Sequence, residues 1–220
     1  MTEGIFDGAI WLPGPTWKVG YTVFGRTSQK RGVVDHSADG PLQATLGVLN
    51  GPRTASWQFT NDDDLYQHYS INDVCWHAGY EANRVCVGVE NTGKGPLTER
   101  QYNNLLRLHR WLKVQGVLTV CERRIDLWEH NEWMATDCPS GRIPWERLIA
   151  DLREEDMKLY RMKDRPEVYF AAGGKLVHIP NRSVFIALGY KDEDVEVLPA
   201  GSPIWGLPVE YPSGVPADLR

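Results

Sequence analysis

The strongest constraint in this sequence is a histidine followed eight residues later by a cysteine that directly precedes a proline. The residues are His130, Cys138 and Pro139. Imidazole and thiolate groups on one loop are ligands typical of zinc. A further histidine, His36, follows the short apolar run 32–34, where a strand would end and point it into a cleft. These residues predict a His/His/Cys metal site whose fourth tetrahedral position is open, as in catalytic zinc centres.

The composition is that of an ordinary globular protein. The chain has 220 residues, of which 42% are hydrophobic and 24% charged, and this length allows one substantial core with a small appendage. The formal net charge of −5 implies no broad basic surface of the kind that neutralises phosphates. We therefore expect no nucleic acid among its partners, and the oligomeric state stays open.

The N-terminus and the cysteines bear on the compartment. Glu3 and Asp7 stand where a signal peptide would carry lysine or arginine, and no long apolar stretch follows. We expect synthesis in the cytoplasm of the producing cell without a signal peptide, and no membrane insertion. Free thiols are the rule there, so Cys75, Cys86 and Cys121 are interpreted as buried thiols rather than disulfide partners.

Apolar spacing and turn residues predict a chain of alternating helices and strands. The clearest helix starts with a capping box at Thr98 and Gln101, followed by apolar residues at helical spacing. A buried strand over 86–90 would deliver Glu90 at its end. The other expected elements are a strand over 32–34, a helix over 41–50, a hairpin with strands over 55–60 and 65–70, and a helix from Pro144 to Met157.

A change of pattern near Arg165 predicts two unequal domains. Residues 1–164 would form the main domain, with an irregular arm over 1–31, and residues 165–220 a small β-rich module. Short β-like runs broken by glycine and proline are expected over 168–172, 175–179 and 195–198, and a proline-rich extended tail over 206–220.

Several motifs follow His36 in a fixed order. They are Trp76-His77-Ala78-Gly79, Asn83, Val87-Gly88-Val89-Glu90, His130 and Thr136-Asp137-Cys138-Pro139. In this order they resemble the zinc-dependent N-acetylmuramoyl-L-alanine amidases, the type 2 amidases that share a fold with peptidoglycan recognition proteins and include many phage endolysins. The resemblance covers roughly 32–152 and implies an α/β fold with a central mixed β-sheet flanked by helices.

The resemblance implies a zinc cofactor held by His36, His130 and Cys138. Asp137 is a competing third ligand, since some members use an aspartate, but there the aspartate itself directly precedes the proline. Zinc with an open position lowers the pKa of bound water to roughly 7 and polarises a scissile carbonyl. The alternative for each of these residues taken alone is a purely structural role, as a packed histidine or a buried thiol.

Two further residues are implied as catalytic. Glu90 matches the strand-end acidic residue of the family, which would take a proton from the water and pass it on; the alternative is a solvated glutamate. Thr136 stands where some members place a lysine and others a threonine. Its hydroxyl can donate a hydrogen bond to the oxyanion but brings no positive charge, so its contribution would be smaller.

Two residues are implied as contacts for substrate. Trp57 replaces a tyrosine that faces the metal in several members, and it would form an apolar wall against sugar or peptide, or else belong to the core. His77 would line the cleft and hydrogen-bond the substrate, or else support a loop.

The predicted activity is hydrolysis of the amide between N-acetylmuramic acid and L-alanine in bacterial peptidoglycan. A phage endolysin released through a holin pore fits best, with a prophage-borne or wall-recycling enzyme as alternatives. The rival functions are a non-catalytic peptidoglycan-binding protein on the same fold and a zinc peptidase acting within the stem peptide. The C-terminal module would bind the cell wall through exposed aromatics, or support the main domain, or mediate self-association. The candidate aromatics are Tyr169, Phe185, Tyr190 and Trp205.

Overall fold

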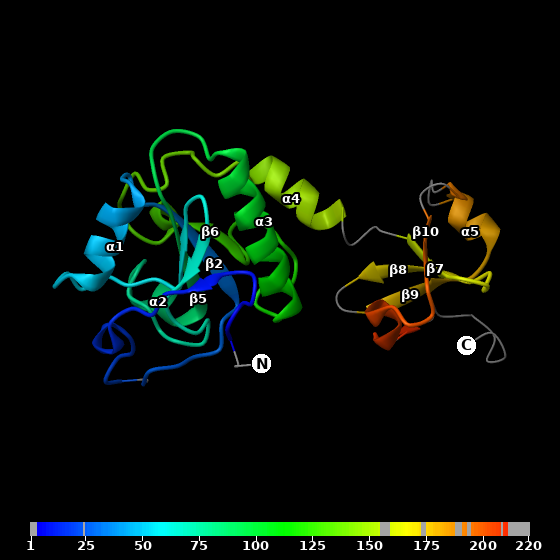
Figure 1. Cartoon of the computed structure of the whole chain (residues 1–220), viewed down its shortest axis with the longest axis horizontal. Helices are drawn as coiled ribbons and strands as arrows, with labels where there is room; N and C mark the ends of the chain where they lie inside the picture. Colours follow the sequence, from blue (N-terminus) through cyan, green and yellow to red (C-terminus); the bar gives the residue numbers. More distant parts are fainter. Residues whose placement is uncertain are drawn as a thin grey trace. The chain divides into compact units, whose positions relative to one another are not determined.

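The structure is a computed structural model, and its chain divides into two compact units, Met1–Ile149 and Ala150–Arg220. Each unit is described by itself (Figure 1). The residues described are 4–23, 25–154, 159–172, 175–187, 191–192, 195–207 and 209–210.

The first unit is built on a six-stranded sheet. Only one neighbouring pair, β3 with β4, is antiparallel, and every other pair is parallel. This confirms the predicted mixed sheet. In spatial order the strands are β1 (Ile10–Trp11), β4 (Leu65–Gln67), β3 (Phe59–Asn61), β5 (Cys86–Asn91), β2 (Gly32–Ser37) and β6 (Leu127–Glu129).

Two central strands, β2 and β5, carry the core of this unit. Val33, Val34, Val87 and Val89 are fully buried, as expected for parallel strands covered on both faces. Helix α3 (Glu99–Val114) lies against one face, where His109 Nε2 lies 3.1 Å from the Asp35 carboxylate. Because successive side chains alternate between the faces of a strand, His36 points to the opposite face, away from α3.

The helices of the first unit follow the predicted pattern. Helix α1 (Leu42–Asn50) begins after a proline, and the predicted capping box at the start of α3 is present, with both reciprocal hydrogen bonds. Helix α4 (Trp145–Glu154) begins where predicted, while the rest of its expected range, 155–157, lies outside the described residues. The short elements α2 (Tyr80–Val85), β1 and β6 and the 3₁₀ turns η1 (Thr16–Lys18) and η2 (His130–Glu132) were not expected as separate elements.

The thiols agree with a further expectation. Cys75, Cys86 and Cys121 are buried, and none of them forms a disulfide with another described residue. In the part of the chain that the structure describes, each helix is too short or too polar to cross a membrane.

The second unit contains a five-stranded sheet, in which the three predicted strands are found over their predicted ranges. Phe185 is only 4% exposed and packs with Leu159 and Ile179, so the prediction of an exposed aromatic there was wrong. Tyr190 and residues 211–220 of the expected tail lie outside the described residues. In spatial order, the strands are β10 (Val195–Leu198), β7 (Leu159–Met162), β8 (Val168–Ala172), β9 (Lys175–Ile179) and β11 (Val209–Glu210). The unit also contains the helix α5 (Arg182–Ala187) and the 3₁₀ turn η5 (Pro203–Gly206).

Candidate metal centre

His36 and Glu90 lie side by side at the carboxyl ends of two parallel strands. They are register partners in the β2–β5 ladder, so their side chains leave the same face of the sheet. His36 Nδ1 lies 3.9 Å from Glu90 Oε1, and the His36 side chain is 1% exposed. The strand pattern therefore places an imidazole and a carboxylate together without help from any loop.

His130 and Cys138 reach the same place from the loop that follows β6. His130 opens the turn η2, and its ring centroid lies 4.5 Å from that of His36. Cys138 Sγ accepts a hydrogen bond from the main-chain N–H of Ser37 at 3.1 Å and lies 3.9 Å from His36 Nδ1. The loop thus brings both of its predicted ligands to the end of β2.

The three predicted ligands form one compact group. His36, His130 and Cys138 each offer one ligand atom, and these atoms all lie within 4.8 Å of one another. His130 Nε2 is buried and has no hydrogen-bond partner among the described residues, as expected of a nitrogen that serves as a ligand. Two imidazoles and one thiolate are a donor set suited to zinc. Asp137, the alternative third ligand, is exposed and lies outside this group.

His77 supports His36 from the side away from the group. Its Nδ1 lies 3.0 Å from His36 Nε2, which leaves His36 Nδ1 for the side where Glu90 and Cys138 lie. Gly88 makes room for this ring, because a Cβ at position 88 would come within 2.7 Å of His77 Cγ. An imidazole ligand is commonly oriented by a hydrogen bond to its other nitrogen, and His77 occupies that place.

Burial sets the protonation of the group. It holds the pKa of His36 well below its usual value, with added repulsion from His77 and His130, and it also lowers the pKa of His130. Both rings are therefore neutral near pH 7, the form in which imidazole binds metals. Burial raises the pKa of Cys138 to about 11, so this thiol must lose its proton when it binds a metal.

Among the carboxyl groups of the described residues, Glu90 has the most strongly raised pKa. Burial raises its pKa to about 8, and its Oε2 is buried without a hydrogen-bond partner among the described residues. A carboxyl group with this pKa can both hold and release a proton near neutral pH. A cation bound at the neighbouring ligands would pull the pKa of Glu90 downward, because it favours the charged carboxylate.

All the predicted site residues line one cavity of about 330 Å³. Trp57 is 3% exposed, and its ring belongs both to the cavity wall and to a core cluster with Leu49, Tyr69 and Cys75. Thr136 is exposed, and its Oγ1 accepts a hydrogen bond from the Cys138 N–H at 3.3 Å. The lining includes His36, Trp57, His77, Glu90, His130, Thr136 and Cys138.

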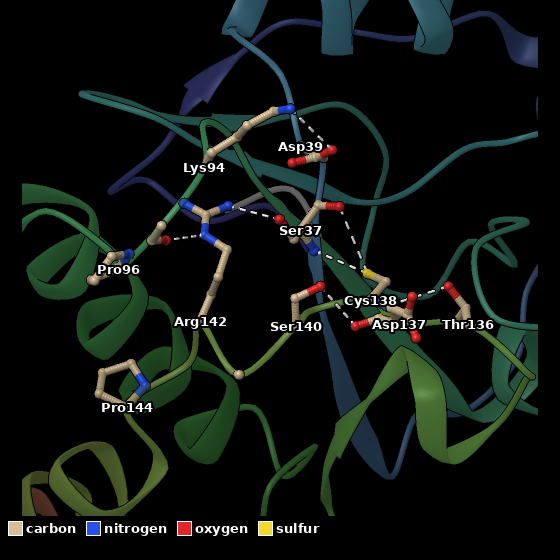
Figure 2. A pocket seen from close by; sticks show the side chains of 12 residues that line it. Ser37, Asp39, Lys94, Pro96, Thr136, Asp137, Cys138, Ser140, Arg142 and Pro144 are labelled. Carbon is tan, nitrogen blue, oxygen red and sulfur yellow. Dashed lines mark hydrogen bonds and ion pairs between the residues drawn. The ribbon is translucent and has the colours of Figure 1, made fainter.

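The cavity that the predicted site residues line shares lining residues with two larger pockets. One, of about 690 Å³, shares Ser37, Thr136 and Cys138 with it and carries the charged side chains of Asp39 and Lys94 (Figure 2). The other, of about 580 Å³, shares Ala55, Trp76, His77 and His130 and is also lined by Tyr21 and Met134. The candidate centre therefore lies where an extended ligand could cross from a charged region to an aromatic one.

The sequence analysis missed Ser37 and Arg142. Ser37 contacts Cys138 through its N–H, and Arg142 Nη1 donates to Ser37 Oγ at 2.9 Å. Figure 2 shows Ser37 between Cys138 and the Arg142 guanidinium. Their only sequence signal is proximity, since one follows His36 directly and the other comes four residues after Cys138.

Comparison with known proteins locates the centre within a recognised family segment. A family model described as N-acetylmuramoyl-L-alanine amidase matches residues 26–141, just over half of the chain. The amidase XlyA of Bacillus subtilis is 28% identical over an alignment of 126 residues, and the match covers 53% of this chain and 40% of XlyA. The amidase CwlH of the same organism is 26% identical over an alignment of 127 residues, and the match covers 54% of this chain and 48% of CwlH. This chain thus spans less than half the length of either relative.

A solved structure supports the fold. It is that of the endolysin N-acetylmuramoyl-L-alanine amidase LysCS from Clostridium intestinale, with a TM-score of 0.51 and 20% identity. The likeness covers 68% of this chain and 98% of that one.

Proposed function

Because the chain belongs to the N-acetylmuramoyl-L-alanine amidase family, we propose that it hydrolyses the amide between N-acetylmuramic acid and the L-alanine of the stem peptide in bacterial peptidoglycan. The observation that carries this proposal is the convergence of His36, His130 and Cys138 to within 4.8 Å, inside the segment that matches the family. These three residues would hold zinc. When bound, zinc would polarise the carbonyl of the scissile amide and lower the pKa of water, which makes a nucleophile available near neutral pH.

Glu90 is the proposed proton carrier. Its carboxyl group faces His36 from the adjacent strand, and its buried Oε2 is not occupied by a hydrogen-bond partner among the described residues. It would accept a proton from the attacking water and deliver it to the leaving amine, since an amine leaves readily only when protonated.

Three other side chains have proposed positioning or binding roles. His77 would hold the His36 ring in the orientation that its 3.0 Å contact defines. Thr136, at the cavity rim, would donate its hydroxyl hydrogen to the developing oxyanion. Trp57 would form the apolar wall against the substrate. These roles use the neutral ring, hydroxyl and indole groups as they stand in the cavity.

Digestion of purified cell walls tests the activity. With zinc-loaded protein, but not with chelated protein, we expect new free L-alanine amino termini and, in mass spectra, stem peptides separated from their sugars. Wall binding without metal and without release would establish instead a non-catalytic binding protein. Products that keep the link to the sugar would establish a peptidase that cuts within the stem.

The biological setting is a finer proposal. A phage endolysin role is supported by the likeness in fold to the endolysin LysCS, and the protein would then reach the wall from the cytoplasm through a holin pore. Expression of the chain in a susceptible host, with and without a holin, tests this role. Lysis only when the holin is induced is expected, whereas lysis without it would contradict holin dependence.

The C-terminal module is proposed to bind the cell wall; the sequence predicted it as residues 165–220, whereas the second compact unit begins at Ala150 and includes β7. Two of its aromatic rings lie together, with Tyr169 and Trp205 centroids 5.9 Å apart, and both are partly exposed. Their planes meet at 70°, edge to face, and partly exposed aromatic rings offer apolar surface to a sugar face. A Trp205→Ala variant should bind wall fragments more weakly with unchanged cleavage of a small soluble muropeptide, and unchanged wall affinity would contradict this role.

A further inference from the structure

Arg142 joins three segments of the chain around the metal centre. Its side chain is buried, with the residue 8% exposed, and its guanidinium donates to one hydroxyl and to four main-chain carbonyls. Nε donates to Gly95 O at 2.5 Å; Nη1 donates to Ser37 Oγ, Asn91 O and Gly93 O, each at 2.9 Å; and Nη2 donates to Thr92 O at 2.9 Å.

Two of these partners, Ser37 and Asn91, adjoin residues of the proposed site. Ser37 directly follows His36, and its N–H donates to Cys138 Sγ at 3.1 Å. Residues 91–93 directly follow Glu90 at the end of β5. Arg142 itself lies four residues after Cys138 on the same loop. One side chain therefore connects the ends of β2 and β5 to the loop that carries the sulfur ligand (Figure 2).

The geometry requires arginine rather than any cation. A guanidinium presents five N–H donors in a fixed plane, so it can bond to acceptors from separate segments at the same time. A lysine ammonium has three donors at a single point on a flexible stem, and it cannot reach the Ser37 hydroxyl and the carbonyls of 91–95 together. Without the fork, buried carbonyl groups lose their donors and the loop loses its attachment to the sheet.

We propose that Arg142 is a positioning residue of the metal centre, which sets the place of Cys138 Sγ relative to His36 by fixing the 138–142 loop to the ends of β2 and β5. The proposal rests on the metal site of the proposed function. Residues that support metal ligands from behind typically change metal affinity by about 10–100-fold when they are replaced. Arg142 should belong to this class although it touches no metal itself.

Zinc affinity, measured by competition with a chromophoric chelator on the full chain, tests this role. Arg142→Met and Arg142→Lys should each weaken zinc binding by about 10–100-fold. The matched control is Arg147→Met, which removes another arginine whose guanidinium donates to Glu99 on the exposed surface of α3 and α4. The control should bind zinc within about twofold of wild type, because Arg147 contacts Glu99 and the Tyr102 ring on α3, a helix that carries none of the three proposed ligands.

A spectroscopic readout separates positioning from general stability. With cobalt in place of zinc, the near-ultraviolet charge-transfer band reports the bond to the Cys138 sulfur. This band should weaken or shift in both Arg142 variants and stay unchanged in Arg147→Met. Full recovery of affinity and of the band in Arg142→Lys would overturn the proposal, since positive charge alone would then suffice.

Ser37→Ala keeps the test decisive if Arg142→Met does not fold. It removes only the hydroxyl acceptor and should weaken zinc binding by about fivefold, the usual value of one hydrogen bond. Unchanged zinc affinity and cobalt band in folded Arg142→Met, or in Ser37→Ala if the former is unfolded, would overturn the proposal. Wild-type protein that binds zinc but releases no L-alanine termini would overturn the proposed activity alone.

Discussion

His36 and Cys138 come to the same point of the molecule by different means. His36 sits on β2, which has parallel neighbours on both sides, and it is 1% exposed. Cys138 sits on a loop, is only partly buried, and is held by a main-chain N–H of Ser37 and, through Ser37, by Arg142. Backbone ladders fix the strand half of the site, whereas the loop half is joined to the sheet by side-chain contacts of Cys138 and Arg142, beside main-chain bonds within the loop such as Asn131 N–H to Cys138 O at 2.9 Å.

The difference teaches where the site can be disturbed without loss of the fold. A ladder of parallel strands is part of the core, so it changes only when the whole unit unfolds. A loop can shift when a single contact is lost. Substitutions in the loop half should therefore act mainly on metal affinity, and substitutions around the strand half on proton transfer and stability.

Replacement of the loop ligand should have the largest effect. Cys138→Ser should abolish amidase activity and lower zinc affinity by more than the roughly 100-fold that loss of a supporting residue causes, because a serine hydroxyl stays protonated near pH 7. Thermal unfolding of the metal-free protein should change little. The control is Cys121→Ser, which changes a buried thiol outside the proposed site. Full activity of Cys138→Ser would remove this ligand assignment.

Glu90→Gln tests the strand half. The amide cannot carry the proton, so kcat should fall by about 10²–10⁴-fold, while zinc content stays that of the wild type because the three ligands are intact. Glu99→Gln, an exposed carboxyl group on α3, serves as the control and should be fully active. Wild-type rates in Glu90→Gln would reduce Glu90 to a structural residue.

His77→Ala distinguishes two roles for this ring. If His77 orients His36 through their 3.0 Å contact, zinc affinity should fall by about 10–100-fold. This outcome would show that the strand ligand also depends on one side-chain contact. Zinc affinity equal to wild type with a raised KM would instead support the substrate contact predicted from the sequence.

A histidine behind the cavity wall should affect stability rather than chemistry. His68 Nδ1 donates to Leu12 O at 2.7 Å, and its Nε2 accepts from Thr60 Oγ1 at 2.8 Å, an oxygen that also accepts from Trp57 Nε1. Burial lowers the pKa of His68 to about 4. The unfolded chain therefore binds more protons between pH 6.5 and 4, so the free energy of unfolding falls as the pH is lowered, by up to about 3 kcal/mol.

Denaturant unfolding of chelated protein at several pH values checks this dependence. His68→Gln should lose part of the fall between pH 6.5 and 4, because glutamine does not titrate there. The same pH dependence in the variant and in wild type would contradict the assignment, and the fall would then belong to other buried histidines.

The sequence predicted the strand half of the site better than the loop half. Apolar runs identified β2 and β5, and a capping box identified α3, because these signals act locally. The ordered motifs gave His36, Glu90, His130 and Cys138. The role of Arg142 was not predicted, because its five acceptors lie 47 to 105 residues away in sequence. Local sequence patterns do not indicate contacts over such separations.

Two other features were difficult to predict: the short elements of the first unit and the burial of side chains in the second. Helix α2 and strand β6 contain 6 and 3 residues, too few to show a clear period. Phe185 looked available for wall binding, yet α5 turns it against Leu159 and Ile179. Whether an aromatic side chain faces solvent depends on the packing of the element that carries it, which composition alone does not reveal.

X-ray absorption at the zinc edge tests the central claim most directly. For the full chain loaded with one zinc ion, a centre of His36, His130 and Cys138 predicts one sulfur neighbour at about 2.3 Å and two imidazole nitrogens at about 2.0–2.1 Å, plus one light atom. In Cys138→Ser the sulfur neighbour should disappear. A wild-type spectrum without sulfur, or one that keeps its sulfur in the variant, would contradict the centre described for this protein.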